Sequence, residues 1–261
     1  MGAVWITGAS SGIGKACALR YAAQKRALVL TSSSRDKLEA VARECLDLGA
    51  VAVTVLPYDF RDPDGVEGLV REAWRQSGGI DAMFCNAGVS QRTTVLDTSM
   101  ETVRELMEIN YFAPVQMAKS ILPFMLDAGG GTIAVTTSIA GRFGFPLRCA
   151  YSSSKHALYG FFETLRAEYY SKGIRVTIVC PGRVRTDISL NARDKGGRPH
   201  GTMDPGQASG LSPEKAAKRI VRAIDHGRRE VLVGRGELLM VQVKRFLPGL
   251  CAWIGRHISA V

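Results

Sequence analysis

The strongest constraint on this chain is its alternation of short apolar runs with longer stretches of helical periodicity. The runs are Ala3–Thr7, Ala27–Thr31, Val51–Leu56, Asp81–Cys85, Thr132–Thr136, Arg175–Val179 and Glu230–Val233. The helical stretches between them are Ile13–Gln24, Asp36–Asp47, Pro63–Arg75, Met100–Leu126 and Ser152–Ser171. Strands that alternate with helices form right-handed βαβ units, and almost wholly apolar strands are typical of a sheet covered on both faces. The sequence therefore predicts one α/β domain with a doubly wound parallel sheet of about seven strands.

Composition narrows the class of protein. A chain of 261 residues, 46% apolar and 22% charged, suits one large globular domain. The net charge of +10 is dispersed, which favours a solvated basic surface, and no nucleic-acid recognition motif is present. The six cysteines include no CxxC pair and the four histidines have no ligand spacing, so we expect reduced thiols and no metal. With no apolar stretch of about 18–20 residues and no signal peptide, the expected location is cytoplasmic.

A glycine-rich turn, Thr7–Gly14, follows the first apolar run and opens the first helical stretch. Glycines let the backbone turn sharply and let a pyrophosphate approach the free N–H groups of a helix N-terminus. In a βαβ context this position favours dinucleotide binding over a simple tight turn. The expected contacts are Gly8, Ser10, Ser11, Gly12, Ile13 and Gly14.

Tyr151 and Lys155 lie four residues apart within a helical stretch and therefore share one face. A neighbouring ammonium stabilises tyrosinate and lowers the pKa of the phenol. A phenol tuned in this way can act as a general acid or base. Alone, however, such a pair more often marks an exposed helix face.

The ordered set of motifs resembles the short-chain dehydrogenase/reductase family in its compact form. The glycine spacing is TGxxxGxG, and the later motifs are Asp59-Phe60, Asn86-Ala87-Gly88, Asn110, Ser138, Tyr151 with Lys155, Pro181-Gly182 and Thr186. The resemblance runs from Ala3 to about Val233 and implies a Rossmann-type fold. It also implies hydride transfer between a nicotinamide and a carbonyl or secondary alcohol, an oxidoreductase acting on CH–OH groups.

The resemblance implies a role for each catalytic position. Tyr151 would be the general acid or base, and Lys155 would also hold the nicotinamide ribose. Ser138 would orient the substrate carbonyl, and Asn110 would hold a water that connects Lys155 to solvent. Each has a plainer alternative, such as a serine that ends a strand or an asparagine that satisfies backbone groups.

The remaining motifs would hold the cofactor. By resemblance, Asp59 meets the adenine amino group and Phe60 flanks the adenine. Asn86, Ala87 and Gly88 stabilise the cleft near the adenosine ribose. Pro181, Gly182, the Val184 backbone and the Thr186 hydroxyl lie at the carboxamide end.

Cofactor choice depends on the residues after the second run. No acid follows it; the sequence there is Ser32, Ser33, Ser34 and Arg35, which suits the 2′-phosphate of NADP(H). Many NADP-dependent members of the family place arginine where this chain has Ser33. NADP(H) is therefore expected ahead of NAD(H).

The region from about 183 to 235 resembles the subgroup around dehydrogenase/reductase SDR family member 7 and the 11β-hydroxysteroid dehydrogenase-like enzymes. It implies a lipophilic substrate of the steroid, retinoid or aliphatic ketone type. Members of this subgroup often carry an N-terminal membrane anchor, which this chain, starting at its first strand, is not expected to have. The expected substrate pocket comprises Ser138, Ile139, Arg142, Phe143, Phe145 and the segment from Ile188 onward. Arg142 would meet an acidic group of the substrate or be an ordinary surface arginine.

The domain organisation follows from these regions. Residues 1–235 would form the catalytic domain, with a substrate lid at about 188–212, and residues 236–261 an amphipathic extension interrupted at Pro248. The extension would lie on a membrane surface or, as we favour, pack on the domain or on another subunit of a homodimer or homotetramer. Two other functions stay open: a non-catalytic NADP(H)-binding sensor, and a sugar-nucleotide epimerase or dehydratase, which usually has TGxxGxxG spacing.

Overall fold

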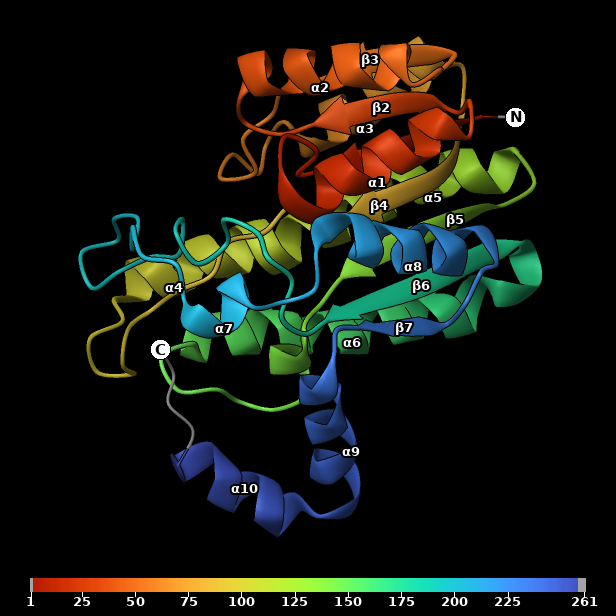
Figure 1. The fold of residues 1–261 in the computed structure, drawn as a ribbon. Coiled ribbons are helices and arrows are strands. Elements are labelled where there is room, and N and C mark those ends of the chain that lie inside the picture. Colours follow the sequence, from red (N-terminus) through yellow and green to blue (C-terminus); the bar gives the residue numbers. More distant parts are fainter. Residues whose placement is uncertain (1, 258–261) are drawn as a thin grey trace.

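The computed structural model describes residues 2–257, so residue 1 and the last part of the predicted extension, 258–261, lie outside the described residues. Within that range the strands form one parallel sheet in the order β3-β2-β1-β4-β5-β6-β7 (Figure 1). They are β1 (Ala3–Thr7), β2 (Ala27–Thr31), β3 (Ala52–Val55), β4 (Ile80–Cys85), β5 (Gly131–Thr136), β6 (Ile174–Pro181) and β7 (Glu230–Val233). The predicted doubly wound sheet is confirmed.

Helices cover both faces of this sheet (Figure 1). One face packs against α1 (Gly12–Ala23), α2 (Arg35–Asp47) and α8 (Pro213–Asp225). The other packs against α3 (Val66–Ser77), α5 (Ala113–Asp127) and α6 (Cys149–Tyr169). Neighbouring residues of a strand point to opposite faces, so Ile6 joins the first buried cluster and Trp5 the second. This explains why the strands are apolar at most positions on both faces.

The predicted helix Met100–Leu126 is wrong in one detail. The chain is helical throughout, but α4 (Met100–Met107) is joined to α5 by a π-helical turn, Glu108–Phe112. Such turns add one residue to a helical turn and occur often at functional sites. The turn contains Asn110, and apolar periodicity alone carries no signal for it. Single 3₁₀ turns occur at Ile139–Gly141, Tyr170–Lys172 and Gly236–Leu238.

The segment 188–212, here called the lid segment, contains one short helix, α7 (Pro205–Ala208). Ser212 then caps α8, because its Oγ accepts a hydrogen bond from the Lys215 N–H. Beyond β7 the chain forms α9 (Leu239–Phe246) and α10 (Pro248–His257), separated at Pro248 as predicted. These two helices are called the arm.

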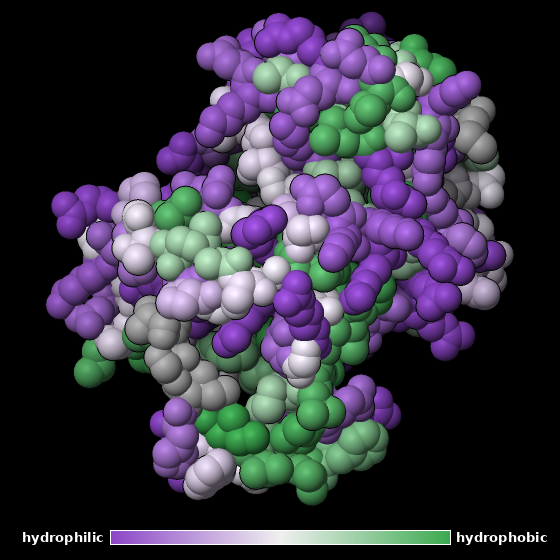
Figure 2. Space-filling view, in the orientation of Figure 1, coloured by the Kyte–Doolittle hydropathy of each residue, from purple (hydrophilic) through white to green (hydrophobic). Residues whose placement is uncertain are grey.

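The arm packs on the domain along one side only. Cys251 is buried together with Ile139, Phe143 and Cys180. The other side exposes Leu239, Phe246, Leu247, Leu250 and Trp253, and Figure 2 shows apolar surface gathered over this part of the molecule. Among the described residues, none of the helices is both long and apolar enough to span a membrane.

Candidate active site

A cavity of about 710 Å³ opens at the carboxyl ends of the central strands. This is the place where open α/β sheets bind ligands. Most of the predicted cofactor residues line it: Gly8, Ser10, Ser11, Gly12, Ile13, Ser32, Ser33, Asp59, Phe60, Asn86, Ala87, Gly88, Tyr151, Lys155, Pro181, Gly182, Val184 and Thr186. Tertiary structure thus brings both halves of the chain to one site.

The glycine turn has the backbone shape that its sequence predicts. Gly8 and Gly12 have φ values of +63° and +53°, which side chains disfavour. A Cβ on Gly14 would lie 2.2 Å from the Gly8 carbonyl oxygen, so this glycine lets α1 pack against the turn. The Ser11 side chain makes no cap hydrogen bond, which leaves the N–H groups of α1 available to an anion.

Thr7 and Asn86 join the ends of the strands beneath the cavity. The Thr7 hydroxyl accepts hydrogen bonds from the backbone N–H groups of Asn86 and Ala87, both at 3.0 Å. The Asn86 amide donates to the Thr7 carbonyl at 3.2 Å and accepts from the Thr136 hydroxyl at 3.1 Å. The asparagine therefore joins the ends of three strands, and its part in stabilising the cofactor cleft stays a prediction.

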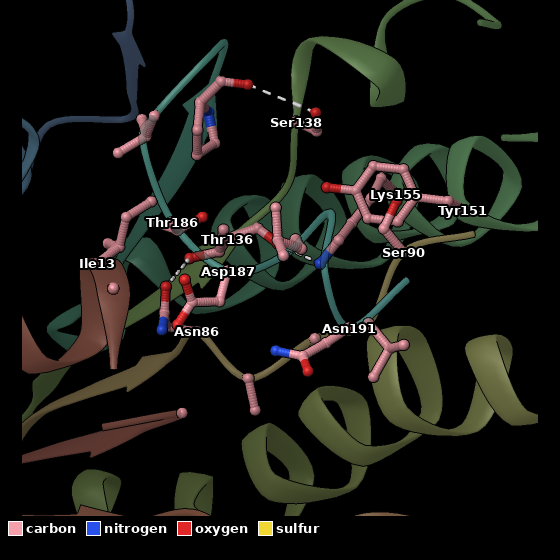
Figure 3. A pocket seen from close by; sticks show the side chains of 18 of the residues that line it. Ile13, Asn86, Ser90, Thr136, Ser138, Tyr151, Lys155, Thr186, Asp187 and Asn191 are labelled. Carbon is pink, nitrogen blue, oxygen red and sulfur yellow. Dashed lines mark hydrogen bonds between the residues drawn. The ribbon is translucent and has the colours of Figure 1, made fainter. Parts of the chain in front are cut away.

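Tyr151 and Lys155 project from the first turns of α6 into the cavity, and Ser138 faces them from the end of β5 (Figure 3). Lys155 Nζ donates to the Thr136 carbonyl at 2.8 Å and lies 5.9 Å from the centre of the Tyr151 ring. The Ser138 hydroxyl accepts from the Ala140 N–H at 3.1 Å. A substrate oxygen at this wall would meet a phenol and a hydroxyl together.

The pKa shifts of Tyr151 and Lys155 differ from those expected from the sequence. Burial raises the pKa of Tyr151, and the Ser138 hydroxyl with the charges of Arg92 and Arg148 opposes that rise. Burial lowers the pKa of Lys155 to about 7, so this side chain is only partly charged at neutral pH. In this structure the permanent positive charges near the phenol are therefore arginines, and the expected net lowering of its pKa is not found.

Asn110 lies behind the cavity, fully buried in the π-helical turn. Its side chain accepts from the Val89 N–H at 2.8 Å and donates to the Val89 carbonyl at 2.9 Å and the Ser154 hydroxyl at 3.1 Å. The asparagine thus fixes the loop after β4 against α6. Its part in a water relay stays a prediction.

Several predicted contacts lie outside the cavity lining, although Ser138, Ile139, Phe145 and Ile188 are part of it. Ser34 occupies the N-cap position of α2 without a side-chain cap hydrogen bond, and Arg35 turns outward and pairs with Glu39 at 3.6 Å. Arg142 lies outside this lining: its guanidinium covers the Tyr159 ring and pairs with Glu230 at 2.5 Å. Phe143 packs inward against Cys251. The sequence predicted the segment to which each of these residues belongs, but it did not predict where their side chains point.

Sequence reasoning missed a group of charged residues in the lining. Arg92 follows β4, Arg148 precedes α6, and Asp204 belongs to the lid segment. All three occupy irregular segments, where no periodicity marks a side chain as buried. Gln207 of α7 was also missed; it donates to the Val184 carbonyl and, at 3.4 Å, to the Thr186 hydroxyl.

The comparison with known proteins identifies the family. A family model described as short chain dehydrogenase matches residues 2–196. The chain therefore belongs to the short-chain dehydrogenase/reductase family of oxidoreductases. It is 37% identical over 253 residues to Dehydrogenase/reductase SDR family member 7B of Xenopus laevis, covering 95% of this chain and 78% of that protein.

A second relative supports the same assignment. The chain is 35% identical over 255 residues to Dehydrogenase/reductase SDR family protein 7-like of Drosophila melanogaster, covering 96% of this chain and 78% of the relative. The predicted resemblance to the subgroup around SDR family member 7 is thereby confirmed.

Solved structures agree with the fold. A short chain dehydrogenase/reductase from Burkholderia phymatum in complex with NAD superposes with a TM-score of 0.84 at 25% identity, covering 95% of each chain. A short-chain dehydrogenase from Sphingobium yanoikuyae in complex with NADPH gives 0.81 at 25% identity, covering 100% of this chain and 98% of the other.

Proposed function

We propose that this protein is an NADP(H)-dependent oxidoreductase that transfers a hydride between the nicotinamide and a carbonyl or secondary alcohol of a lipophilic substrate. The observation that carries the proposal is that Tyr151, Lys155 and Ser138 line the same cavity as the glycine turn. A non-catalytic sensor would have no need for this arrangement. The TGxxxGxG spacing speaks against a sugar-nucleotide epimerase or dehydratase.

The cavity fits a dinucleotide. The Ser32 hydroxyl is buried without a hydrogen-bond partner in the described structure and lies in the lining, as expected of a group that a ligand satisfies. The N-terminus of α1 would hold the pyrophosphate, and Asp59 would hold the adenine. Val184 and Thr186 would hold the carboxamide. These groups span the cavity from one end to the other.

The preference for NADP(H) depends on the end of β2. Ser32 and Ser33 line the cavity there, and no carboxylate follows the strand to bind a ribose 2′-hydroxyl. Arg35 faces away, so the hydroxyls rather than this arginine support the preference. The similar structures include one with NADPH and one with NAD, and do not favour either cofactor.

The residues of the site suit proton transfer coupled to redox chemistry. When bound, the nicotinamide supplies or accepts the hydride. In reduction the Tyr151 phenol donates its proton to the carbonyl oxygen, and in oxidation it accepts the proton of the alcohol. The Ser138 hydroxyl donates a hydrogen bond to the same oxygen. Lys155 holds the ribose and assists the return of the proton to Tyr151.

The lining of the cavity includes an apolar part in addition to the charged side chains Arg92, Arg148 and Asp204. Ile139, Phe145 and Ile188 lie in the lining near Tyr151. Apolar walls with few polar groups favour lipophilic molecules. Steroids, retinoids and aliphatic ketones are therefore the substrate classes to test.

A screen of NADPH oxidation over ketosteroids, retinal, diketones and aliphatic ketones tests the proposal. Tyr151→Phe should lower kcat by about 10²-fold or more, because the proton donor is lost while the ring remains. The variant should bind NADPH as the wild type does, measured by fluorescence titration. Equal turnover by wild type and variant would overturn the mechanism, and equal or better kcat/KM with NADH would overturn the cofactor preference.

The proposal also covers the location of the protein and its association with other molecules. All six cysteines are free thiols, which suits the reducing cytoplasm. The exposed apolar side of the arm supports a homodimer or homotetramer, with contact to a membrane surface as the alternative. Small molecules rather than nucleic acids remain the expected ligands.

A further inference from the structure

Three charged side chains form a buried cluster in the wall of the cavity. Arg92 comes from the loop after β4, Arg148 directly precedes α6, and Asp204 begins α7 in the lid segment. Their side chains are only 3%, 15% and 8% exposed. Asp204 Oδ2 accepts from Arg92 Nη2 at 2.6 Å and from Arg148 Nη2 at 3.0 Å.

The arginines are held by the fixed part of the domain. Arg92 Nη1 donates to the Ser90 hydroxyl at 2.8 Å and to the Gln91 carbonyl at 2.6 Å. Burial raises the pKa of Asp204, but the two guanidiniums outweigh it and keep the pKa below its ordinary value, so the carboxylate stays ionised. The cluster therefore carries two positive charges and one negative charge.

Stabilisation of the fold does not by itself explain why these charges are buried. Taking charges out of water costs several kcal/mol per ion, and buried ion pairs are weak evidence for stabilisation. Buried charges in a cavity wall more often serve a site. Here the site is Tyr151, which follows Arg148 by three residues.

Arg92 is coupled to the same tyrosine through the chain. Its neighbour Gln91, fully buried, accepts a hydrogen bond from the Tyr151 backbone N–H at 3.1 Å. The segment that holds Arg92 thereby also caps the first turn of α6. A shift of the segment that holds Arg92 would therefore also shift the first turn of α6.

The other titratable groups near the phenol cannot replace the arginines. Lys155 lies 5.9 Å from the ring centre, and burial lowers its pKa to about 7. The Cys180 thiol of β6 has its pKa raised to about 11 by burial, so it is neutral at working pH. Arg92 and Arg148 therefore supply the lasting positive charge, and Asp204 supplies the charge that offsets it.

Asp204 is the member of the cluster that the lid segment contributes. The same segment contacts the cavity through Gln207, which bonds to Val184 and Thr186. Both contacts depend on the position of α7. The charge beside Tyr151 is thus tied to where the lid segment lies.

We propose that Asp204 is a positioning residue that docks the lid segment on Arg92 and Arg148 and, by offsetting their charge, sets the proton affinity of Tyr151. The inference rests on the proposed function of Tyr151 as acid and base. With Asp204 in place the phenol is a weaker acid, and without the Asp204 charge it would be a stronger one.

Asp204→Asn tests the inference, since asparagine keeps the size of the side chain and removes its charge. The phenol of Tyr151 should titrate about one pH unit lower, because Arg92 and Arg148, which lower its pKa, would no longer be offset by the Asp204 carboxylate. The titration is followed at the tyrosinate absorbance as the difference from the same background carrying Tyr151→Phe. The pH profile of kcat/KM for alcohol oxidation should move by the same amount, and KM should rise.

Arg148→Gln is the opposing variant and also protects the test if Asp204→Asn does not fold. The variant leaves Arg92 alone beside the Asp204 carboxylate, so the net positive charge of the cluster is lost. The phenol of Tyr151 should therefore titrate at a higher pH than in the wild type. Asp194→Asn is the matched control in the lid segment, because Asp194 accepts only local bonds from Gly196 and Arg198 and pairs with Arg198. It should leave the titration and the profile in place.

The outcomes separate the inference from the proposed function. A changed KM with an unmoved phenol titration in Asp204→Asn, or no upward shift in Arg148→Gln, would overturn the inference alone. Equal turnover by wild type and Tyr151→Phe would overturn the function, and the inference with it.

Discussion

Lys155 is an active-site residue whose charge the fold constrains strongly. Its side chain is enclosed, and its Nζ has the Thr136 carbonyl as hydrogen-bond acceptor. Burial lowers the pKa from 10.5 to about 7. Between these two values the unfolded chain holds a proton that the folded protein has released. Because the unfolded state binds more protons there, the stability contributed by neutral Lys155 is complete above about pH 10.5 and is lost as the pH falls towards about 7.

We predict that Lys155 contributes a rise of up to about 1.4 kcal/mol per pH unit to the free energy of unfolding between about pH 7.5 and 9.5, whatever slope the other groups add. Lys155→Met, which removes the titrating group, should flatten that rise. Urea denaturation at a series of pH values measures both. Lys15→Met serves as control, since Lys15 pairs with Glu44 at the surface at 2.8 Å and should keep the wild-type slope. Parallel curves for wild type and Lys155→Met would contradict the prediction.

At the scale of single elements, the glycine turn and α1 act as one unit. Gly14 sits in the first turn of α1, where a Cβ would lie 2.2 Å from the Gly8 carbonyl oxygen and 2.8 Å from the Asn86 amide nitrogen. Neither contact involves a flexible side-chain end that can move aside easily. Any added methyl must therefore shift the helix away from the turn.

Gly14→Ala should destabilise the fold by about 1–3 kcal/mol through overpacking. It should also weaken NADPH binding, because the N–H groups at the start of α1 move away from the pyrophosphate position. Denaturation and fluorescence titration test these two effects. Gly68→Ala is the matched control at an exposed position of α3, where nothing lies within 4 Å of the new Cβ. It should stabilise by about 0.5–1 kcal/mol and leave binding unchanged, and a similar loss in both variants would contradict the packing argument.

At the scale of the whole molecule, the arm has one side whose apolar side chains are exposed. One side covers Ile139 and Phe143 next to the active site, while Phe246 and Trp253 are 69% and 58% exposed on the other. Exposed apolar patches of this kind mark association sites. A second copy of the chain is the occupant we favour.

The double substitution Phe246→Ser and Trp253→Ser should shift the protein from dimer or tetramer towards monomer in size-exclusion chromatography with light scattering. The melting temperature of the monomer should change little, since both side chains are largely exposed. Leu96→Ser is the control, because Leu96 is 98% exposed on a different surface. Monomeric wild-type protein, together with co-sedimentation on anionic vesicles that the double variant loses, would favour the membrane alternative instead.

The sequence by itself determined the sheet, the glycine turn and the order of the motifs. Apolar runs of strand length and helical periodicity are local properties, so they predict β1 to β7 and the main helices with small errors at their ends. The spacing of Tyr151 and Lys155 is local as well. Motif order then sufficed to identify the family.

Only the tertiary structure decided which side chains share the cavity. Arg35 and Arg142 turn to Glu39 and Glu230 instead, because ion pairs with nearby acids compete with the predicted contacts. The π-helical turn, which positions Asn110, also has no local signal. The cluster of Arg92, Arg148 and Asp204 joins residues 56 and 112 positions apart, from segments without periodicity. Burial and charge in such a cluster arise from packing of distant segments, and that is why the group that tunes Tyr151 is visible only in the folded molecule.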